Sequence, residues 1–173
     1  MTQEIINNII NDVKSKYKDF ESPNRSFASS LLLNHLNLYK ELLDNYSVYA
    51  DHDLNSLVCI RYTIEKEGNS WEVCASLVGR YAMVSRQIGE WSWVVVCDGA
   101  YTDSFDKEIL QIVNKCNFYS LSEFVLKTII PGFRFEIFYT DEMEIQNWAY
   151  VYQVLFFYEN YDLLCDYNAE DVN

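Results

Sequence analysis

The apolar period changes from helical to alternating near residue 57, and this change constrains the fold more than any other feature of the sequence. Apolar residues occupy every second position from Val58 to Ile64 and again from Trp71 to Leu77, with the triplet Glu67-Gly68-Asn69 between the two runs. Strict alternation is typical of half-buried strands, and a glycine-containing turn between two such runs indicates a hairpin. Residues 81–88 and 91–97 follow after further glycines, so we predict a four-stranded antiparallel meander.

Two helices are predicted ahead of the meander. The first has apolar residues at helical spacing between Ile5 and Tyr17, and Ser22-Pro23-Asn24 ends the pattern. The second has an apolar stripe from Phe27 to Tyr46 and fades at the polar segment 51–56. We expect that polar segment to be a solvated connection from helix to strand.

Two short helices are predicted after the meander. Thr102 or Asp103 stands where an N-cap is needed before the apolar residues between Ile109 and Cys116. Ser120-Leu121-Ser122-Glu123 has the capping-box pattern of a further helix, which Ile130-Pro131-Gly132 ends. Both helices therefore lie between the meander and the strands predicted at the C-terminal end.

A C-terminal hairpin completes the predicted fold. Residues 133–139 alternate as a strand, whereas residues 145–158 fit both a helix and a strand. Aromatic and β-branched enrichment favours a strand for the second segment, with a turn in the acidic run 140–144. The expected fold class is α+β: a single domain over residues 1–173, built on an antiparallel sheet with a four-stranded central meander, a C-terminal hairpin, two N-terminal helices and two short helices between the strand groups.

Negative charge is concentrated at the C-terminal end. The chain has 13 bases and 26 acids, a net charge of −13, but residues 1–134 hold all 13 bases and 17 of the acids. Residues 135–173 hold the other nine acids and no base, and tyrosines and a tryptophan lie among them. Carboxylates steer cationic partners and accept bidentate arginine contacts, while Tyr and Trp serve as rigid anchors. We therefore predict a partner-binding surface made of Glu136, Asp141, Glu142, Glu144, Trp148, Tyr150, Glu159, Tyr161, Asp162 and Asp166.

This acidic and aromatic composition favours a binding module over an enzyme. In size, charge and aromatic content the chain resembles small acidic bacterial immunity proteins and antitoxins, which implies a basic protein partner, such as a cognate toxin whose active site is occluded. A first alternative is a phage-type or plasmid-type inhibitor that mimics nucleic acid toward a DNA-binding enzyme. A second is a small ligand-binding domain or enzyme, for which Asp51, His52, Asp53 and Arg86 are the candidate residues. Direct nucleic-acid binding is not expected, because the densest basic run, within residues 14–18, is short.

No catalytic, cofactor or metal site is predicted. The sequence contains neither a glycine-rich phosphate loop nor a nucleophile elbow. His35 falls on a predicted helix without a second ligand at metal spacing, and the five cysteines form no CxxC pair and are interpreted as reduced, buried residues. Arg80 and Arg86 are expected to pair with carboxylates nearby, such as Glu72 or Glu90.

The expected location is the cytoplasm. The first residues, Met-Thr-Gln-Glu, lack the charged start and apolar run of an export signal. The longest uncharged apolar stretch covers residues 145–158, which is shorter than the roughly 20 residues needed to span a bilayer.

Overall fold

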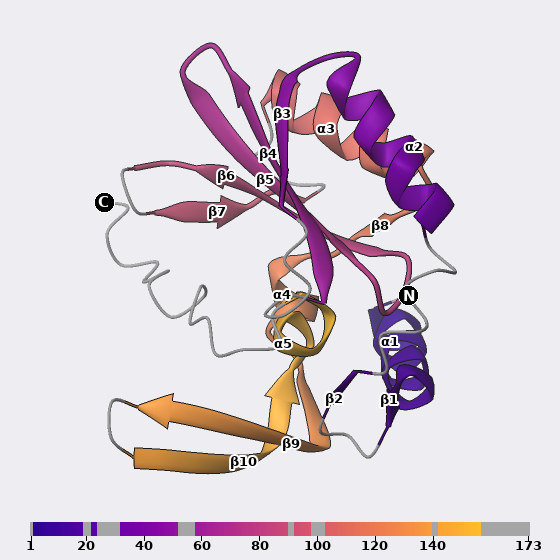
Figure 1. Cartoon of the computed structure of the whole chain (residues 1–173), viewed down its shortest axis with the longest axis vertical. Helices are drawn as coiled ribbons and strands as arrows, with labels where there is room; N and C mark the ends of the chain where they lie inside the picture. Colours follow the sequence, from indigo (N-terminus) through magenta and orange to yellow (C-terminus); the bar gives the residue numbers. More distant parts are fainter. Residues whose placement is uncertain are drawn as a thin grey trace.

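A six-stranded sheet forms the centre of the computed structural model, which describes residues 2–18, 22–23, 32–51, 58–89, 92–97, 103–139 and 142–156 (Figure 1). Five strands follow one another across the sheet in antiparallel order: β3 (Ser47–Asp51), β4 (Cys59–Lys66), β5 (Asn69–Ser76), β6 (Tyr81–Gln87) and β7 (Trp93–Val95). The short strand β8 (Tyr119–Ser120) pairs with β6 in parallel. The predicted meander is confirmed as β4 to β7, and β3 adds an edge strand that the sequence analysis did not predict.

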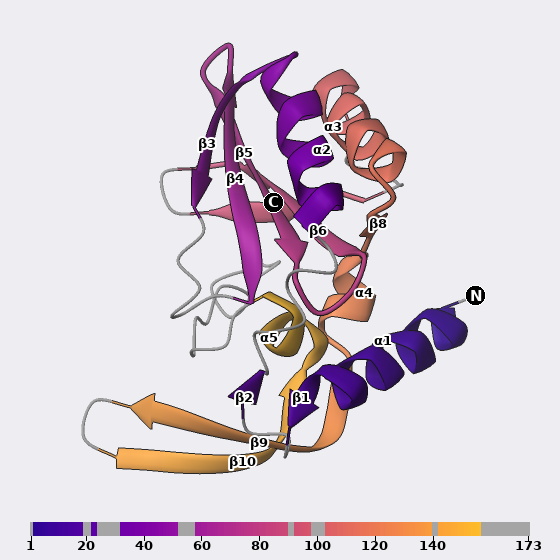
Figure 2. The ribbon, with the colours of Figure 1, turned by 45° about the vertical axis from the view of Figure 1, so that its right-hand side comes forward.

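Alternation along the strands places different side chains on the two faces of the sheet. Trp71, Val73 and Ala82 lie on one face, where α2 (Leu32–Leu43) and α3 (Ser104–Lys115) cover them. Figure 2 shows both helices on the same side of the sheet. This packing forms one of two apolar clusters.

The second cluster lies at one end of the opposite face. There α1 (Thr2–Lys16), α4 (Glu123–Leu126) and α5 (Val151–Phe156) pack together against sheet residues such as Cys74 and Met83. The two N-terminal helices predicted from the sequence are confirmed as α1 and α2. In the part of the chain that the structure describes, none of the helices is long and apolar enough to cross a membrane.

The N-terminal and C-terminal segments meet in this second cluster. The Tyr17 hydroxyl donates a hydrogen bond to the Val154 carbonyl oxygen at 2.6 Å, which ties the end of α1 to α5. The same tyrosine begins the short strand β1 (Tyr17–Lys18), which pairs with β2 (Ser22–Pro23). Residues 137 positions apart in the sequence are thus held together in the core.

The two helices after the meander begin at capping residues. Asp103 caps α3, because its side chain accepts a hydrogen bond from the backbone N–H of Asp106 at 2.8 Å, which confirms the second of the two predicted cap positions. The cap of α4 is Ser122, which accepts from the backbone N–H of Val125, so the helix begins later than the capping-box pattern indicated. α4 has only four residues, and Phe124 on it is 71% exposed.

A separate hairpin is formed by β9 (Ile129–Tyr139) and β10 (Glu142–Tyr150), which confirms the predicted C-terminal hairpin. Pro131 and Gly132 were expected to end a helix but lie inside β9, beside an irregularity in the register of the pair. A bulge in a two-stranded ribbon tolerates proline, and Gly132 has a φ of 80° that favours glycine.

The predicted strand over residues 145–158 is correct only as far as Tyr150. Residues 151–156 form α5, and all six are buried. A segment that is buried on every side shows no apolar period, so its pattern does not distinguish a helix from a strand. The backbone N–H of Tyr150 donates to Gln153 Oε1 at 2.8 Å and so marks the change from strand to helix.

Candidate functional site

The β9–β10 hairpin extends away from the helices and the six-stranded sheet (Figures 1 and 2). Its two strands pair with each other and, among the strands that the structure describes, with no other. β9 has 11 residues and β10 has nine, so the hairpin is long compared with the short strands β7 and β8. The fold thus presents a two-stranded ribbon that extends from the body and is anchored at its base in the second apolar cluster through Ile130, Phe133 and Ala149.

The register of the ribbon distributes its carboxylates over both faces. Glu142 lies opposite Tyr139 and Glu144 opposite Ile137, whereas Glu136 lies opposite Ile145. Directly opposite residues of an antiparallel pair share a face, and neighbours along a strand alternate. By register Glu142 and Glu144 therefore belong to one face and Glu136 to the other.

Two predicted anchors, Trp148 and Tyr150, lie at the base of the hairpin. Their ring centroids are 5.1 Å apart in an edge-to-face arrangement, and the ring of Tyr150 stacks on that of Tyr152 at 5.5 Å. Tyr150 packs against the second apolar cluster, and Tyr152 is buried in it. This row of three rings joins the ribbon to the core, while Trp148 keeps part of its surface exposed.

The structure therefore brings together half of the predicted partner-binding residues. Glu136, Glu142 and Glu144 are on the ribbon, and Trp148 and Tyr150 are at its base. The other five lie outside the described residues, namely Asp141, Glu159, Tyr161, Asp162 and Asp166. Tyr152 was not among the predicted anchors, although its spacing of two from Tyr150 is a signal that would have found it.

Arg86, a candidate for ligand binding, is instead part of a buried structural network. Its guanidinium lies 2.5 Å from Asp103 Oδ2 and 3.0 Å from Asp106 Oδ2. The Asp106 carboxylate is fully buried and also accepts the indole N–H of Trp71 at 2.8 Å. The expected pairing of Arg86 with Glu72 is wrong, because Glu72 is on the neighbouring position of the facing strand and so on the other face of the sheet. The second expected partner, residue 90, lies outside the described residues.

Asp51, a second candidate, ends the edge strand β3 and accepts a hydrogen bond from the Arg61 guanidinium at 2.6 Å. Burial raises the pKa of the nearby Glu72 carboxyl, and the positive charge of Arg61 opposes this rise. The other two residues of the candidate triplet, at positions 52 and 53, lie outside the described residues. In the described ranges, no three His, Cys, Asp or Glu side chains gather as metal ligands would.

Four cysteines are described, and none of them is in a disulfide. Cys59, Cys74 and Cys116 are buried as expected, whereas Cys97 is only half-buried. A hydrogen bond with Cys59, together with burial, raises the pKa of the Cys74 thiol, and burial raises that of Cys116. Thiols that stay protonated are poor nucleophiles, so this chemistry is that of packing residues.

Comparison with protein-family models, with curated proteins and with solved structures found no match to this chain. The chemistry of its surfaces is therefore the basis for assigning a function.

Proposed function

We propose that this chain is an acidic protein-binding module, an immunity protein or antitoxin that occludes the basic active site of a cognate toxin. The observation that carries the proposal is the β9–β10 hairpin, which extends from the body and has carboxylates on both faces by register. The module needs no cofactor and no catalytic residue for this role. We place it in the cytoplasm, where it would meet such a toxin before export or after entry.

The isolation of the hairpin supports a role in binding. A two-stranded hairpin is at best marginally stable in water, and among the strands that the structure describes no third strand pairs with β9 or β10. β9 and β10 also contain apolar residues at both alternating sets of positions, such as Ile137 on one face and Ile145 on the other. A partner that enclosed the ribbon would pair its edges and remove apolar surface from water.

The dimensions of the hairpin suit occlusion of a cleft. A nine-residue strand such as β10 spans about 30 Å at the usual rise per residue. Carboxylates on both faces match a cleft lined with Arg and Lys, because they attract cations before contact and accept bidentate hydrogen bonds after it. Trp148 and Tyr150 at the base are placed to contact the rim of such a cleft.

The proposal is tested by charge reversal on the hairpin. A pull-down identifies the basic partner, and its association with the chain is measured at low and at high salt. We expect the double variant Glu142→Lys/Glu144→Lys to associate at least about tenfold more slowly at low salt, because electrostatic steering acts mainly on the association rate. The matched control is Glu4→Lys/Asp44→Lys, which changes the net charge by the same amount at exposed positions on the body. Equal rates for the two double variants would disprove the assigned surface.

Competition with DNA decides between immunity and mimicry of nucleic acid. A module that covers the active site of a toxin without nuclease activity leaves DNA binding by other enzymes unchanged. A nucleic-acid mimic is displaced from its partner by duplex DNA, and the displacement weakens as salt increases. Displacement by DNA from a partner that is a DNA-binding enzyme would replace the immunity assignment with mimicry.

A further inference from the structure

A groove of about 540 Å³ lies where α1 meets the β5–β6 connection and the start of β8. Figures 1 and 2 both show the β5–β6 connection next to α1. The buried side of α1 carries Ile6, Ile9 and Val13, so that a different stripe, which includes Asn8 and Asp12, lines the groove. Its volume is within the range of roughly 300–1,000 Å³ that small-molecule sites occupy.

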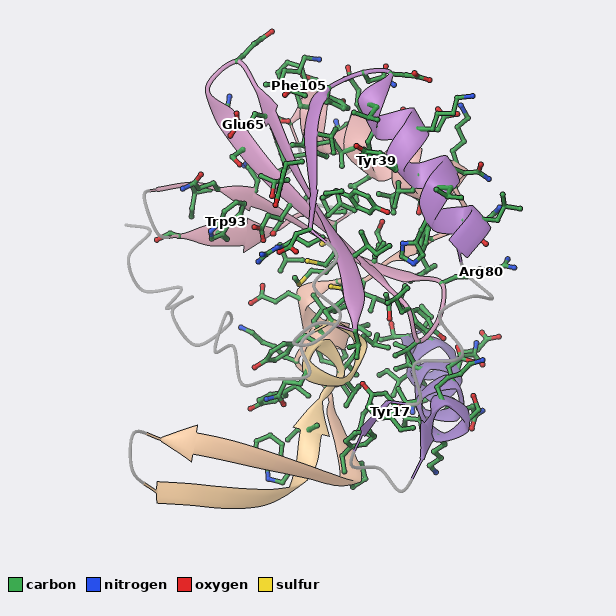
Figure 3. All side chains as sticks on the ribbon, in the orientation of Figure 1. Tyr17, Tyr39, Glu65, Arg80, Trp93 and Phe105 are labelled. Carbon is green, nitrogen blue, oxygen red and sulfur yellow. The ribbon has the colours of Figure 1, made fainter. Side chains whose placement is uncertain are left out.

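Arg80 lines this groove, and among the described residues no carboxylate forms an ion pair with it. The structure describes the side chains of three arginines, and the other two, Arg61 and Arg86, are both bonded to carboxylates. Acids outnumber bases by 26 to 13 in the chain, so an arginine without a carboxylate partner stands out. Figure 3 shows Arg80 at the periphery of the molecule, on the side where α1 and α2 lie. Its guanidinium is therefore available to an anion from outside.

The backbone around Arg80 is held in place before any ligand arrives. The Arg80 carbonyl oxygen accepts the backbone N–H of Tyr119 at 2.8 Å, and the Val78 N–H donates to the Ser76 hydroxyl at 3.1 Å. Gly79 lies directly against the ring of Tyr81, so that an added Cβ would collide with that ring. A site that is already ordered loses little conformational entropy when it binds.

The other polar side chains that line the groove are suited to form hydrogen bonds with the hydroxyl groups of a ligand. The Tyr81 hydroxyl donates to Asp12 Oδ2 at 2.6 Å, which fixes the carboxylate and leaves Oδ1 as an acceptor. The side-chain amides of Asn8 and Asn117 add both donors and acceptors to the lining. A bare anion would be repelled by Asp12, so a fitting ligand offers hydroxyl donors beside its anionic group.

We propose that this groove binds a small phosphorylated polyol, such as a sugar phosphate. Arg80 contacts the phosphate, and Asp12, Asn8 and Asn117 hydrogen-bond the hydroxyl groups. The ligand would bridge α1, the β5–β6 connection and the turn before β8. This site is independent of the proposed partner-binding role, since it shares no residue with the hairpin.

The test is an NMR titration of the ¹⁵N-labelled chain with ribose 5-phosphate. We expect saturable shifts of the backbone amides around Gly79 and Arg80 at millimolar ligand or below. Arg80→Met keeps an unbranched apolar side chain but removes the guanidinium, and it should weaken binding at least about tenfold, because a charge-assisted hydrogen bond is lost. The matched control is Lys107→Met, which removes one positive charge from an exposed position on α3 and should leave binding unchanged.

A second variant keeps the test valid if Arg80→Met folds poorly. Asn8→Ala changes an exposed position of α1, where alanine favours the helix, and it should also weaken binding of ribose 5-phosphate. Three results would each overturn the proposal: the absence of saturable shifts, binding by Arg80→Met equal to that of the unaltered chain, or a loss of binding in Lys107→Met equal to the loss in Arg80→Met. Inorganic phosphate or ribose binding as tightly as ribose 5-phosphate would also overturn it, since neither carries both groups. Partner binding through the hairpin is measured separately and does not depend on any of these results.

Discussion

Acidification is expected to destabilise this protein through the buried imidazole of His35. The residue is 2% exposed, and its ring lies 3.1 Å from the Ser76 carbonyl oxygen and 3.4 Å from the Tyr62 hydroxyl. The ring of Phe118 packs edge-on against it, with the centroids 5.1 Å apart. None of these three groups carries a negative charge that would stabilise an imidazolium, so protonation of the folded state is unfavourable.

The pKa difference between folded and unfolded chain sets the size of the effect. Burial lowers the pKa of His35 from 6.5 to about 4, and the hydrogen bond to Ser76 opposes this decrease. Between these two pKa values the unfolded state binds more protons, so stability is complete above pH 6.5 and is lost as the pH falls toward 4. The loss from this residue is about 2 kcal/mol at about pH 5 and about 3 kcal/mol near pH 4.

Urea unfolding at a series of pH values measures this loss. His52 is the other histidine of the chain, so His52→Gln serves as the control for His35→Gln. A glutamine at position 35 can donate to the Ser76 carbonyl oxygen without titrating. Between about pH 7.5 and about pH 5, we expect the free energy of unfolding to fall by about 2 kcal/mol more in the unaltered chain and in His52→Gln than in His35→Gln. The carboxylates are common to all three proteins, so parallel curves would refute the reasoning.

Two further pairs of variants test the packing of the sheet. Asp106→Asn removes the fully buried carboxylate that bonds both Arg86 and Trp71, leaves Arg86 with Asp103 alone, and should reduce stability by about 2 kcal/mol or more, whereas Asp103→Asn at the exposed cap should cost about 1 kcal/mol or less. If thermal unfolding showed equal losses of stability in these two variants, burial would not explain the larger effect expected at Asp106. Gly79→Ala adds a Cβ against the ring of Tyr81 and should cost about 1–3 kcal/mol, while a Cβ at Gly89 would make only ordinary van der Waals contact with Ser92, so Gly89→Ala should stay within about 0.5 kcal/mol. Melting temperatures that do not separate these two variants would rule out the close approach at Gly79.

The central meander was predictable because its strands bury one face along most of their length. The apolar cluster under α2 and α3 contains alternating residues of both strands: Tyr62 and Ile64 on β4, and Trp71 and Val73 on β5. Their spacing of two in the sequence follows from the alternation of side chains between the two faces of the sheet. β3 was missed for the opposite reason. It is an edge strand of five residues, none of which is buried, and its Tyr49 is 70% exposed. The sequence therefore shows little alternation of apolar and polar residues there.

The partners of charged residues were less predictable than the strands. Glu72 precedes Val73 on β5 and lies opposite Ser85, whereas Arg86 lies opposite Trp71, so the two charges are close in the sheet but on different faces. The carboxylates that do bind Arg86 come from the start of α3, whose position over the sheet is a property of the tertiary fold. For the same reason, the groove beside Arg80 has no counterpart in the sequence: its lining comes from three separate elements.

The hairpin and the body differ in how their acidic residues are balanced by basic ones in the sequence. On the body, salt bridges neutralise the carboxylates of Glu41, Asp51, Asp103, Asp106, Glu108 and Glu123. The hairpin strands contain one base, Arg134, midway along β9, and β10 spans about 27 Å from the level of Tyr150 at the base to that of Glu142 at the outer end. That distance exceeds the screening length of about 8 Å at physiological salt. In the proposed role, the bases of the body would therefore do little to offset the acidic residues near the outer end, which would attract a cationic partner.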